Sequence, residues 1–272
     1  MNHLKFREES ITNIAPNPAL LGLVVLEISP TDLCNRTCSF CPRHDASIYP
    51  NQNLNMSVET ARLLSSQLKD NNFAGYICIA GYGEPLLNPR INEVISELNY
   101  HYLELITNAD PILKGKYNIP DLMGAGISRV LISDYDNNPE LLALASVYPN
   151  VRVRHYIDDG KDHYADYSFS NRAGALWSID KPIQRPCYIP SYKAMVEWNG
   201  DVLLCSHDWS KKTVFGNIHE QDISTIWMSD SFATMRRELF SGNRYKFDAC
   251  SKCTVRGDIM GKKYADYWMA SS

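Results

Sequence analysis

Two features that are common in proteins acting on membranes or nucleic acids are missing from this sequence. Its 272 residues contain no run that approaches the roughly 20 apolar residues of a transmembrane helix, so no membrane partner is expected. No Lys/Arg run is long enough to follow a phosphate backbone, and the formal net charge is −4, so nucleic acid is not expected either. The first ten residues are charged and lack the apolar core of a secretory signal. We therefore expect a cytoplasmic protein.

The sequence also lacks the scattered cysteines of a disulfide framework. Its eight cysteines fall into a set of three and a set of four, with Cys78 left over. In a reducing compartment, thiols clustered in this way are more often metal ligands than disulfide partners. The histidines show no metal-ligand spacing, so the two cysteine sets are the candidate metal sites.

The first set is the run Cys34-Asn-Arg-Thr-Cys38-Ser-Phe-Cys41, which follows an apolar stretch over 22–28 that predicts a strand. A closed structural zinc site has four ligands, so three thiolates are one too few. A four-iron cluster held by three thiolates keeps one iron open to a small molecule. The spacing therefore indicates a reactive iron–sulfur site. The alternative is a zinc site that borrows a distant fourth ligand.

The second set has four members, Cys187, Cys205, Cys250 and Cys253. Cys187 and Cys205 flank a predicted β-hairpin with strands over 194–198 and 201–205, joined by a two-residue Asn199-Gly200 turn. Four thiolates can saturate one iron–sulfur cluster or one structural zinc ion, and these residues alone support the two comparably.

Strands and helices alternate with short connections as far as residue 160. We expect strands over 22–28, 75–80, 102–107, 128–133 and 151–156, and helices over 58–70, 88–99, 122–125 and 139–147. Ser57 is the expected N-cap of the helix over 58–70. This alternation predicts an α/β fold of parallel βαβ units, as a barrel or an open sheet, with working residues at the C-terminal ends of the strands. The alternation is lost after residue 160, and a helix is expected within 222–240.

The first cysteine set, with Phe40 before its last member, closely resembles the radical S-adenosylmethionine (radical SAM) enzymes. The loop Gly81-Tyr82-Gly83-Glu84-Pro85 resembles the GGEP motif of that family, with Tyr82 in place of the first glycine. The resemblance implies a partial (β/α)6 barrel and a [4Fe–4S] cluster on Cys34, Cys38 and Cys41. It also implies that SAM binds the open iron and is cleaved to a 5′-deoxyadenosyl radical, with Glu84 and nearby backbone binding the SAM amino group.

The second cysteine set resembles the shortened SPASM, or twitch, extension of some radical SAM enzymes, since no cysteine follows Cys253. This implies a second, saturated [4Fe–4S] cluster that takes up or passes an electron. The expected divisions are an N-terminal arm over 1–21, the barrel core over 22–160, a barrel end and linker over 161–186, and a twitch domain over 187–272.

Further site residues follow from the same resemblance. Asn108 and Ser133 lie at predicted strand ends, where polar residues of this family often contact SAM or the substrate. The run Ser170-Asn-Arg-Ala-Gly174 resembles one found beside such extensions, and its Arg172 is expected to clamp the SAM carboxylate or to lie over the substrate and assist its deprotonation. The cofactor-binding candidates are Phe40, Tyr82, Gly83, Glu84, Asn108, Ser133, Asn171 and Arg172. Arg172 and Cys78 are the catalytic candidates.

Within the twitch group, the chain most resembles enzymes that oxidise a secondary alcohol of an aminocyclitol to a ketone. This implies a small-molecule substrate, an aminocyclitol or a sugar-like molecule, and a flavodoxin or ferredoxin-type protein as reductant. One alternative is an epimerase that uses Cys78 as hydrogen-atom donor, although most such mid-strand cysteines are small buried hydrophobic residues. Another is a peptide-modifying enzyme. Such enzymes usually carry an N-terminal peptide-recognition domain, for which the residues before the first strand leave little room. A pure electron carrier or a structural zinc protein would bind no SAM.

Overall fold

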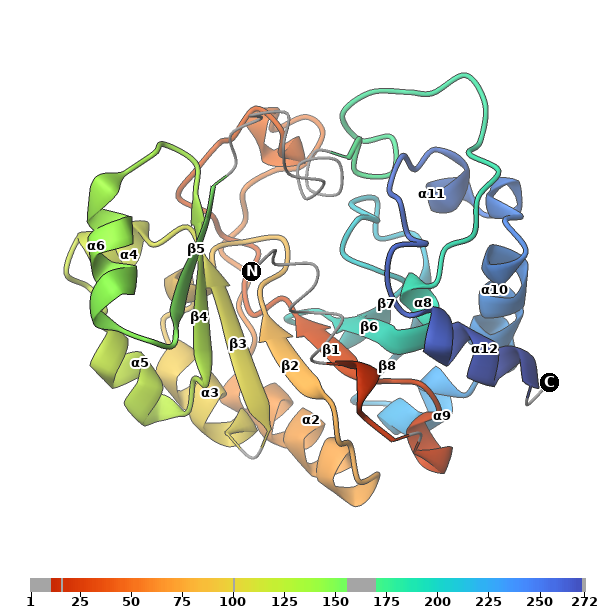
Figure 1. Cartoon of the computed structure of the whole chain (residues 1–272), viewed down its shortest axis with the longest axis horizontal. Helices are drawn as coiled ribbons and strands as arrows, with labels where there is room; N and C mark the ends of the chain where they lie inside the picture. The colour runs from red at the N-terminus through yellow and green to blue at the C-terminus, as the bar shows by residue number, and fades with distance from the viewer. Residues whose placement is uncertain (1–10, 16, 100, 156–169, 271–272) are drawn as a thin grey trace.

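The computed structural model describes residues 11–15, 17–99, 101–155 and 170–270 (Figure 1). Within these ranges one eight-stranded sheet has the order β5-β4-β3-β2-β1-β6-β7-β8. The strands from β5 to β6 in this order are parallel, and β7 and β8 continue the sheet antiparallel. The strands are β1 Val25–Ile28, β2 Tyr76–Ile79, β3 Tyr102–Thr107, β4 Arg129–Asp134, β5 Val151–His155, β6 Lys193–Val196, β7 Asp201–Leu203 and β8 Val214–Asn217.

Helices flank both halves of this sheet. Figure 1 shows α2, α3, α5 and α6 beside the β1–β5 half, and α9, α10 and α12 beside the β6–β8 half. The α-helices are α2 Val58–Asp70, α3 Ile91–Leu98, α4 Asp110–Leu113, α5 Ile119–Ala125, α6 Pro139–Val147, α8 Ile189–Tyr192, α9 Ile223–Trp227, α10 Asp230–Phe240, α11 Asp248–Ser251 and α12 Lys262–Ala270. The short 3₁₀ helices are η1 Pro18–Leu20, η2 Pro42–His44, η3 Pro85–Leu87 and η4 Arg244–Lys246. None of the helices in the described ranges is long and apolar enough to cross a bilayer.

The α/β fold expected from the alternating pattern and the partial barrel that the resemblance implies are confirmed. Helix α2 illustrates why the pattern works, because the Ser57 hydroxyl accepts a hydrogen bond from the Thr60 amide at 3.0 Å and so begins the helix at the expected residue. Ala61, Leu64 and Leu68 recur at helical spacing and are fully buried against the sheet. The observed strands lie within one to three residues of their expected bounds. Tyr156, at the end of the expected fifth strand, lies outside the described residues.

Two expectations for the C-terminal half are wrong in detail. The segment 222–240 forms two helices, because Ser229 caps a new helix by accepting a hydrogen bond from the Phe232 amide. The hairpin loop has three residues between the paired Glu197 and Asp201, with Gly200 at φ +89°. A three-residue loop with glycine in the left-handed region is the next commonest hairpin geometry after the two-residue turn.

The two faces of the parallel sheet differ in chemistry. One face is apolar, with Leu26, Ile77, Leu103 and Val130 packed beneath the helices. On the other face, the strand register places four residues at one level of the sheet. They are Glu27 of β1, Cys78 of β2, Glu104 of β3 and Arg129 of β4. Because partners in parallel register point to the same side, this inner face carries buried charge. The candidate site lies on that side.

Candidate active site

A cavity of about 200 Å³ lies at the C-terminal ends of the parallel strands. Cys34, Cys38 and Cys41 of the loop between β1 and α2 line it. The remaining lining residues that matter here are Glu27, Arg36, Phe40, Gly83, Glu84, Asn108, Ser133, Arg154, Arg172, Lys193, Ser206 and His207. The structure thus brings most of the predicted site residues around one space.

The cysteine loop is held from both sides. The Asn51 side chain accepts a hydrogen bond from the Cys34 amide at 2.9 Å and donates one to the Cys34 carbonyl at 2.8 Å. Arg36 pairs with Asp110 through both its Nε and Nη2 atoms and with Asp136 at 2.7 Å. A bidentate guanidinium pair fixes orientation as well as position. The loop is therefore fixed before any ligand binds.

The Tyr82 loop packs directly on the cysteine loop. A Cβ atom on Gly83 would lie 2.4 Å from the Thr31 carbonyl oxygen, so only glycine allows this approach. The adjacent Glu84 amide donates to the Leu33 carbonyl at 2.9 Å. The buried Glu84 carboxylate accepts hydrogen bonds from Thr107 Oγ1 at 2.7 Å, from the Asn108 amide at 2.8 Å and from the Leu86 amide at 3.2 Å. Burial outweighs these bonds and raises the pKa of Glu84 to about 7.

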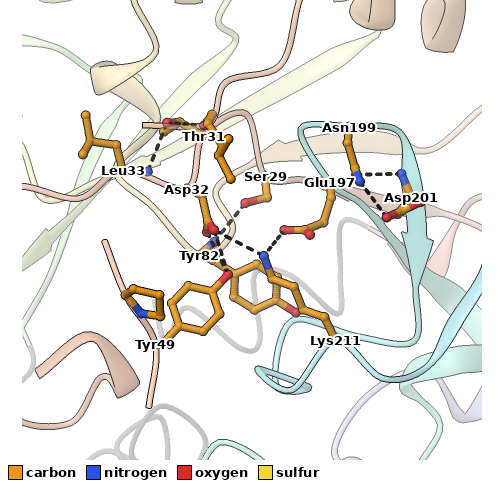
Figure 2. Close-up of polar contacts among 12 residues, drawn as sticks. Ser29, Thr31, Asp32, Leu33, Tyr49, Tyr82, Glu197, Asn199, Asp201 and Lys211 are labelled. Carbon is orange, nitrogen blue, oxygen red and sulfur yellow. Dashed lines mark hydrogen bonds and ion pairs between the residues drawn. The ribbon is translucent and has the colours of Figure 1, made fainter. Parts of the chain in front are cut away.

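Tyr82 also lines the cavity, and its buried side chain lies within a buried charged network (Figure 2). Arg43 pairs with Asp32 at 2.8 Å and donates from Nε to the Tyr82 carbonyl at 2.8 Å. Lys211 reaches Glu197 at 2.7 Å and Asp32 at 3.5 Å, with its ammonium 4.6 Å from the centre of the Tyr82 ring. The network joins the cysteine loop, the end of β6 and the segment after Cys205.

The four cysteines of the second set line a separate cavity. Cys187 stands before α8, Cys205 after β7, Cys250 within α11 and Cys253 after it. A Cβ atom on Gly257 would lie 2.2 Å from Cys187 Sγ, so this glycine leaves the space that the sulfur occupies. Arg244, almost fully buried beside the cavity, donates to the carbonyls of Arg185, Pro186 and Val255 at 2.8–2.9 Å. These contacts set the backbone around the sulfurs and place one positive charge near them.

Each cysteine set offers thiol ligands of the kind that iron–sulfur clusters use. Within the described residues, no group of three or more His, Cys, Asp or Glu is gathered closely enough to hold one ion. The sulfurs instead surround cavities. Burial raises the pKa of the Cys34 thiol to about 11 and also raises the pKa values of Cys187 and Cys250. Coordination to a metal supplies positive charge and so favours the thiolate form of buried thiols of this kind.

Arg172 faces the cavity from a strained backbone. Its φ is +51°, and Ala173 and Gly174 are also left-handed. Its Nη1 lies 3.4 Å from His207 Nδ1, while its buried Nε has no hydrogen-bond partner in the described structure. Burial, followed by the charge of Arg172, lowers the pKa of His207 well below its usual value, so the imidazole is neutral. A buried donor facing an open space fits an acceptor on a bound ligand.

The other predicted residues divide into two groups. Phe40, Asn108 and Ser133 line the cavity, with the Phe40 ring 5.3 Å from that of Tyr135 and Ser133 accepting from Arg154 Nε at 3.0 Å. Asn171 does not line it, because its side chain bonds the backbone at Trp177, Lys252 and Thr254. Cys78 is buried in an apolar cluster with Val25 and Tyr76 and is not among the lining residues.

Four of the cavity-lining residues were not identified from the sequence, namely Glu27, Lys193, Ser206 and His207. Glu27 and Lys193 are charged residues within otherwise apolar strands. That unusual position could have marked them as candidate site residues. Ser206 and His207 directly follow Cys205, so their position depends on a hairpin whose loop has three residues instead of the predicted two.

Comparisons with known proteins agree with this geometry. A family model for the radical SAM superfamily matches residues 28–172, more than half of the chain, and a model for the SPASM iron–sulfur cluster-binding domain matches residues 187–254. The chain therefore belongs to the radical SAM superfamily and carries a SPASM-type region. It is a radical SAM oxidoreductase that uses SAM and iron–sulfur chemistry.

Individual relatives lie within this family. The S-adenosyl-L-methionine-dependent 2-deoxy-scyllo-inosamine dehydrogenase of Niallia circulans is 31% identical over 240 residues, which are 84% of this chain and 92% of the relative. The crystal structure of BtrN in complex with AdoMet and 2-DOIA matches with a TM-score of 0.71 and 28% identity, over 85% of this chain and 92% of that one. The peptide-bound SuiB of Streptococcus suis, at a TM-score of 0.50 and 14% identity over 88% and 76% of the chains, shares the fold alone.

Proposed function

We propose that this enzyme oxidises a secondary alcohol of a small aminocyclitol to a ketone. The observation that carries the proposal is the likeness to the Niallia circulans dehydrogenase and to BtrN over most of both chains. The presence of a second set of four cysteines beside the SAM-side cavity supports it. Oxidation of an alcohol carbon removes a hydrogen atom, a proton and an electron, and a second cluster gives the electron a destination.

Two [4Fe–4S] clusters would be held by this chain, one by Cys34, Cys38 and Cys41 and one by Cys187, Cys205, Cys250 and Cys253. When bound, the first cluster with SAM supplies a 5′-deoxyadenosyl radical that takes the hydrogen atom, and the second accepts the electron. A flavodoxin or ferredoxin-type protein would supply the reducing electron. These assignments follow from the number of sulfurs in each set and from the open position that three ligands leave.

The chain's own residues bind and orient the reactants. The SAM ammonium would be bound by the Glu84 carboxylate and by backbone around Tyr82, Gly83 and Glu84. The charge of the ammonium favours the ionised form of Glu84. Phe40, Asn108 and Ser133 form the adjoining wall of the cavity. Asn171 would act through the Lys252–Thr254 backbone that it bonds, close to Cys253.

Arg172 would bind the alcohol oxygen that becomes the ketone. A guanidinium offers N–H donors and no acceptor, so Arg172 would hold and polarise the oxygen. Neutral His207 accepts a hydrogen bond at Nδ1 from the Arg172 side and so fixes where the guanidinium points.

The proposal is tested with anaerobically reconstituted protein, SAM, a strong reductant and 2-deoxy-scyllo-inosamine. We expect 5′-deoxyadenosine and a ketone product in equal amounts, together with about eight irons per chain, four for each cluster. Formation of 5′-deoxyadenosine without a ketone, across a panel of aminocyclitols, would exclude the proposed substrate class while leaving the SAM chemistry in place.

A further inference from the structure

Two opposite charges that have no role assigned above are buried in the wall of the cavity. Glu27 of β1 and Lys193 of β6 are each 7% exposed and form an ion pair through Glu27 Oε2. Lys193 also donates to Ser206 Oγ at 3.3 Å. All three residues line the cavity. Glu27 lies within β1, two residues before Ser29, so it is about 6–7 Å further from the mouth of the strand end than Ser29 is. We call this group the floor of the cavity.

Stability does not explain a pair of this kind. A buried ion pair gains little over well-packed apolar residues of similar volume, because two charges must be taken out of water. The next positions on the same face of these two strands, Val25 and Met195, are buried and apolar, so the strands otherwise use apolar residues there. A buried pair that borders an open cavity is better suited to recognition of a polar ligand.

The floor has unused capacity to accept hydrogen bonds. A carboxylate offers about four lone-pair positions. Glu84 accepts from three donors. Glu27, the other carboxylate that lines the described cavity, has Lys193 as its one identified donor in the described structure. Its remaining lone pairs suit donors on a ligand.

The charges around the cavity determine which kind of hydrogen-bond donor on a ligand is best placed beside Glu27. The other ionised side chains that line the described cavity away from Glu84 are the cations Arg36, Arg154, Arg172 and Lys193. An ammonium group is therefore repelled over most of the wall and stabilised beside Glu27. Hydroxyl groups are tolerated everywhere, since they can accept from these cations.

We propose that Glu27 binds the ammonium group of the substrate, while Lys193 and Ser206 bind a neighbouring hydroxyl group. This inference rests on the proposed function, because it takes an amine-bearing cyclitol as the ligand. With the amine fixed at one point, the ring has one orientation in the cavity. Glu27 is then the residue that selects an aminocyclitol over a neutral cyclitol.

The test is equilibrium binding to the SAM-bound, oxidised enzyme, which does not turn over. Two ligands are titrated by calorimetry: 2-deoxy-scyllo-inosamine and the same cyclitol with a hydroxyl in place of the amine. Wild-type protein should prefer the amine, and Glu27→Gln should reduce that preference about 10- to 100-fold while leaving SAM affinity unchanged. Glu104→Gln is the matched control, since Glu104 is a buried acid on the same sheet level, paired with Arg129 and absent from the cavity lining.

A second variant guards against simple misfolding. Lys193→Met leaves the Glu27 carboxylate without its cation, so it should keep or increase the preference for the amine. Loss of that preference in Lys193→Met, or an unchanged preference in Glu27→Gln, would overturn the inference while the proposed function stands. If wild-type protein binds neither ligand, the proposed function fails and this inference fails with it.

Discussion

The Nη1 atom of Arg172 lies 3.4 Å from Nδ1 of His207, and His207 lines both the SAM-side cavity and the cavity of the second cysteine set. One imidazole thus separates the place where an alcohol would be oxidised from the place where the electron would arrive. Ser170 Oγ lies 3.2 Å from the same nitrogen, so two side chains contact this edge of the ring. The contact between Arg172 and His207 thus connects the two cavities that the cysteine sets line.

Replacing Arg172 tests its role in holding the alcohol oxygen. Arg172→Gln should lower kcat/KM for the aminocyclitol about 100-fold, because a charge-assisted hydrogen bond to the reacting oxygen is lost. SAM affinity should change little. Steady-state kinetics and SAM titration separate the two effects, and an equal loss of SAM affinity would place Arg172 on the SAM carboxylate instead.

The pH dependence of SAM binding should report Glu84. The pKa of this acid is raised to about 7 in the SAM-free protein. Above that pH the carboxylate is ionised and attracts the SAM ammonium, while below it the protonated acid does not, so affinity should fall as pH drops through 7. Titration of SAM between pH 6 and about 8.5 measures this, and Glu84→Gln should flatten the profile. A wild-type profile that is already flat would contradict a contact between Glu84 and the ammonium.

The network in Figure 2 should contribute to stability through Lys211. Removing one partner of a buried ion pair costs about 3–5 kcal/mol, and the partial exposure of Lys211 lowers the expected loss in Lys211→Met to about 2 kcal/mol. Urea unfolding of the metal-free protein measures it. Lys211→Arg keeps the charge and should lose less than half as much, so equal losses in the two variants would show that packing and not charge matters here.

Gly257 offers a selective way to remove the second cluster. Gly257→Ala places a Cβ atom 2.2 Å from Cys187 Sγ, so the sulfur must move. Iron content should fall from about eight to about four per chain, while reductive cleavage of SAM continues. Gly124→Ala, where a Cβ atom would meet nothing within 4 Å, is the control. Loss of all iron in Gly257→Ala would show that the two sites do not assemble independently.

The fold was largely predictable from the sequence because local signals and burial agree in the parallel half. Ser57 begins α2 at the expected residue, and β3 and α6 have the expected bounds. The seven clustered cysteines were recognisable because their spacing is short or surrounds a hairpin. Candidate iron–sulfur sites and a candidate SAM loop could thus be proposed without coordinates.

Residues whose role depends on distant neighbours could not be predicted in the same way. Glu27 and Lys193 are far apart in sequence, and only the β1–β6 pairing brings them together. Asn171 was expected at the cofactor, but its amide is used by backbone more than 80 residues away. The split of 222–240 into two helices depends on Ser229, a single capping residue within an otherwise helical pattern.

The most direct test of the account uses an aminocyclitol that carries deuterium at the alcohol carbon. Under anaerobic reduction, wild-type protein should form 5′-deoxyadenosine that contains the deuterium, with one ketone for each 5′-deoxyadenosine. Unlabelled 5′-deoxyadenosine, or labelled 5′-deoxyadenosine with recovered alcohol in place of ketone, would contradict oxidation of the aminocyclitol by this enzyme.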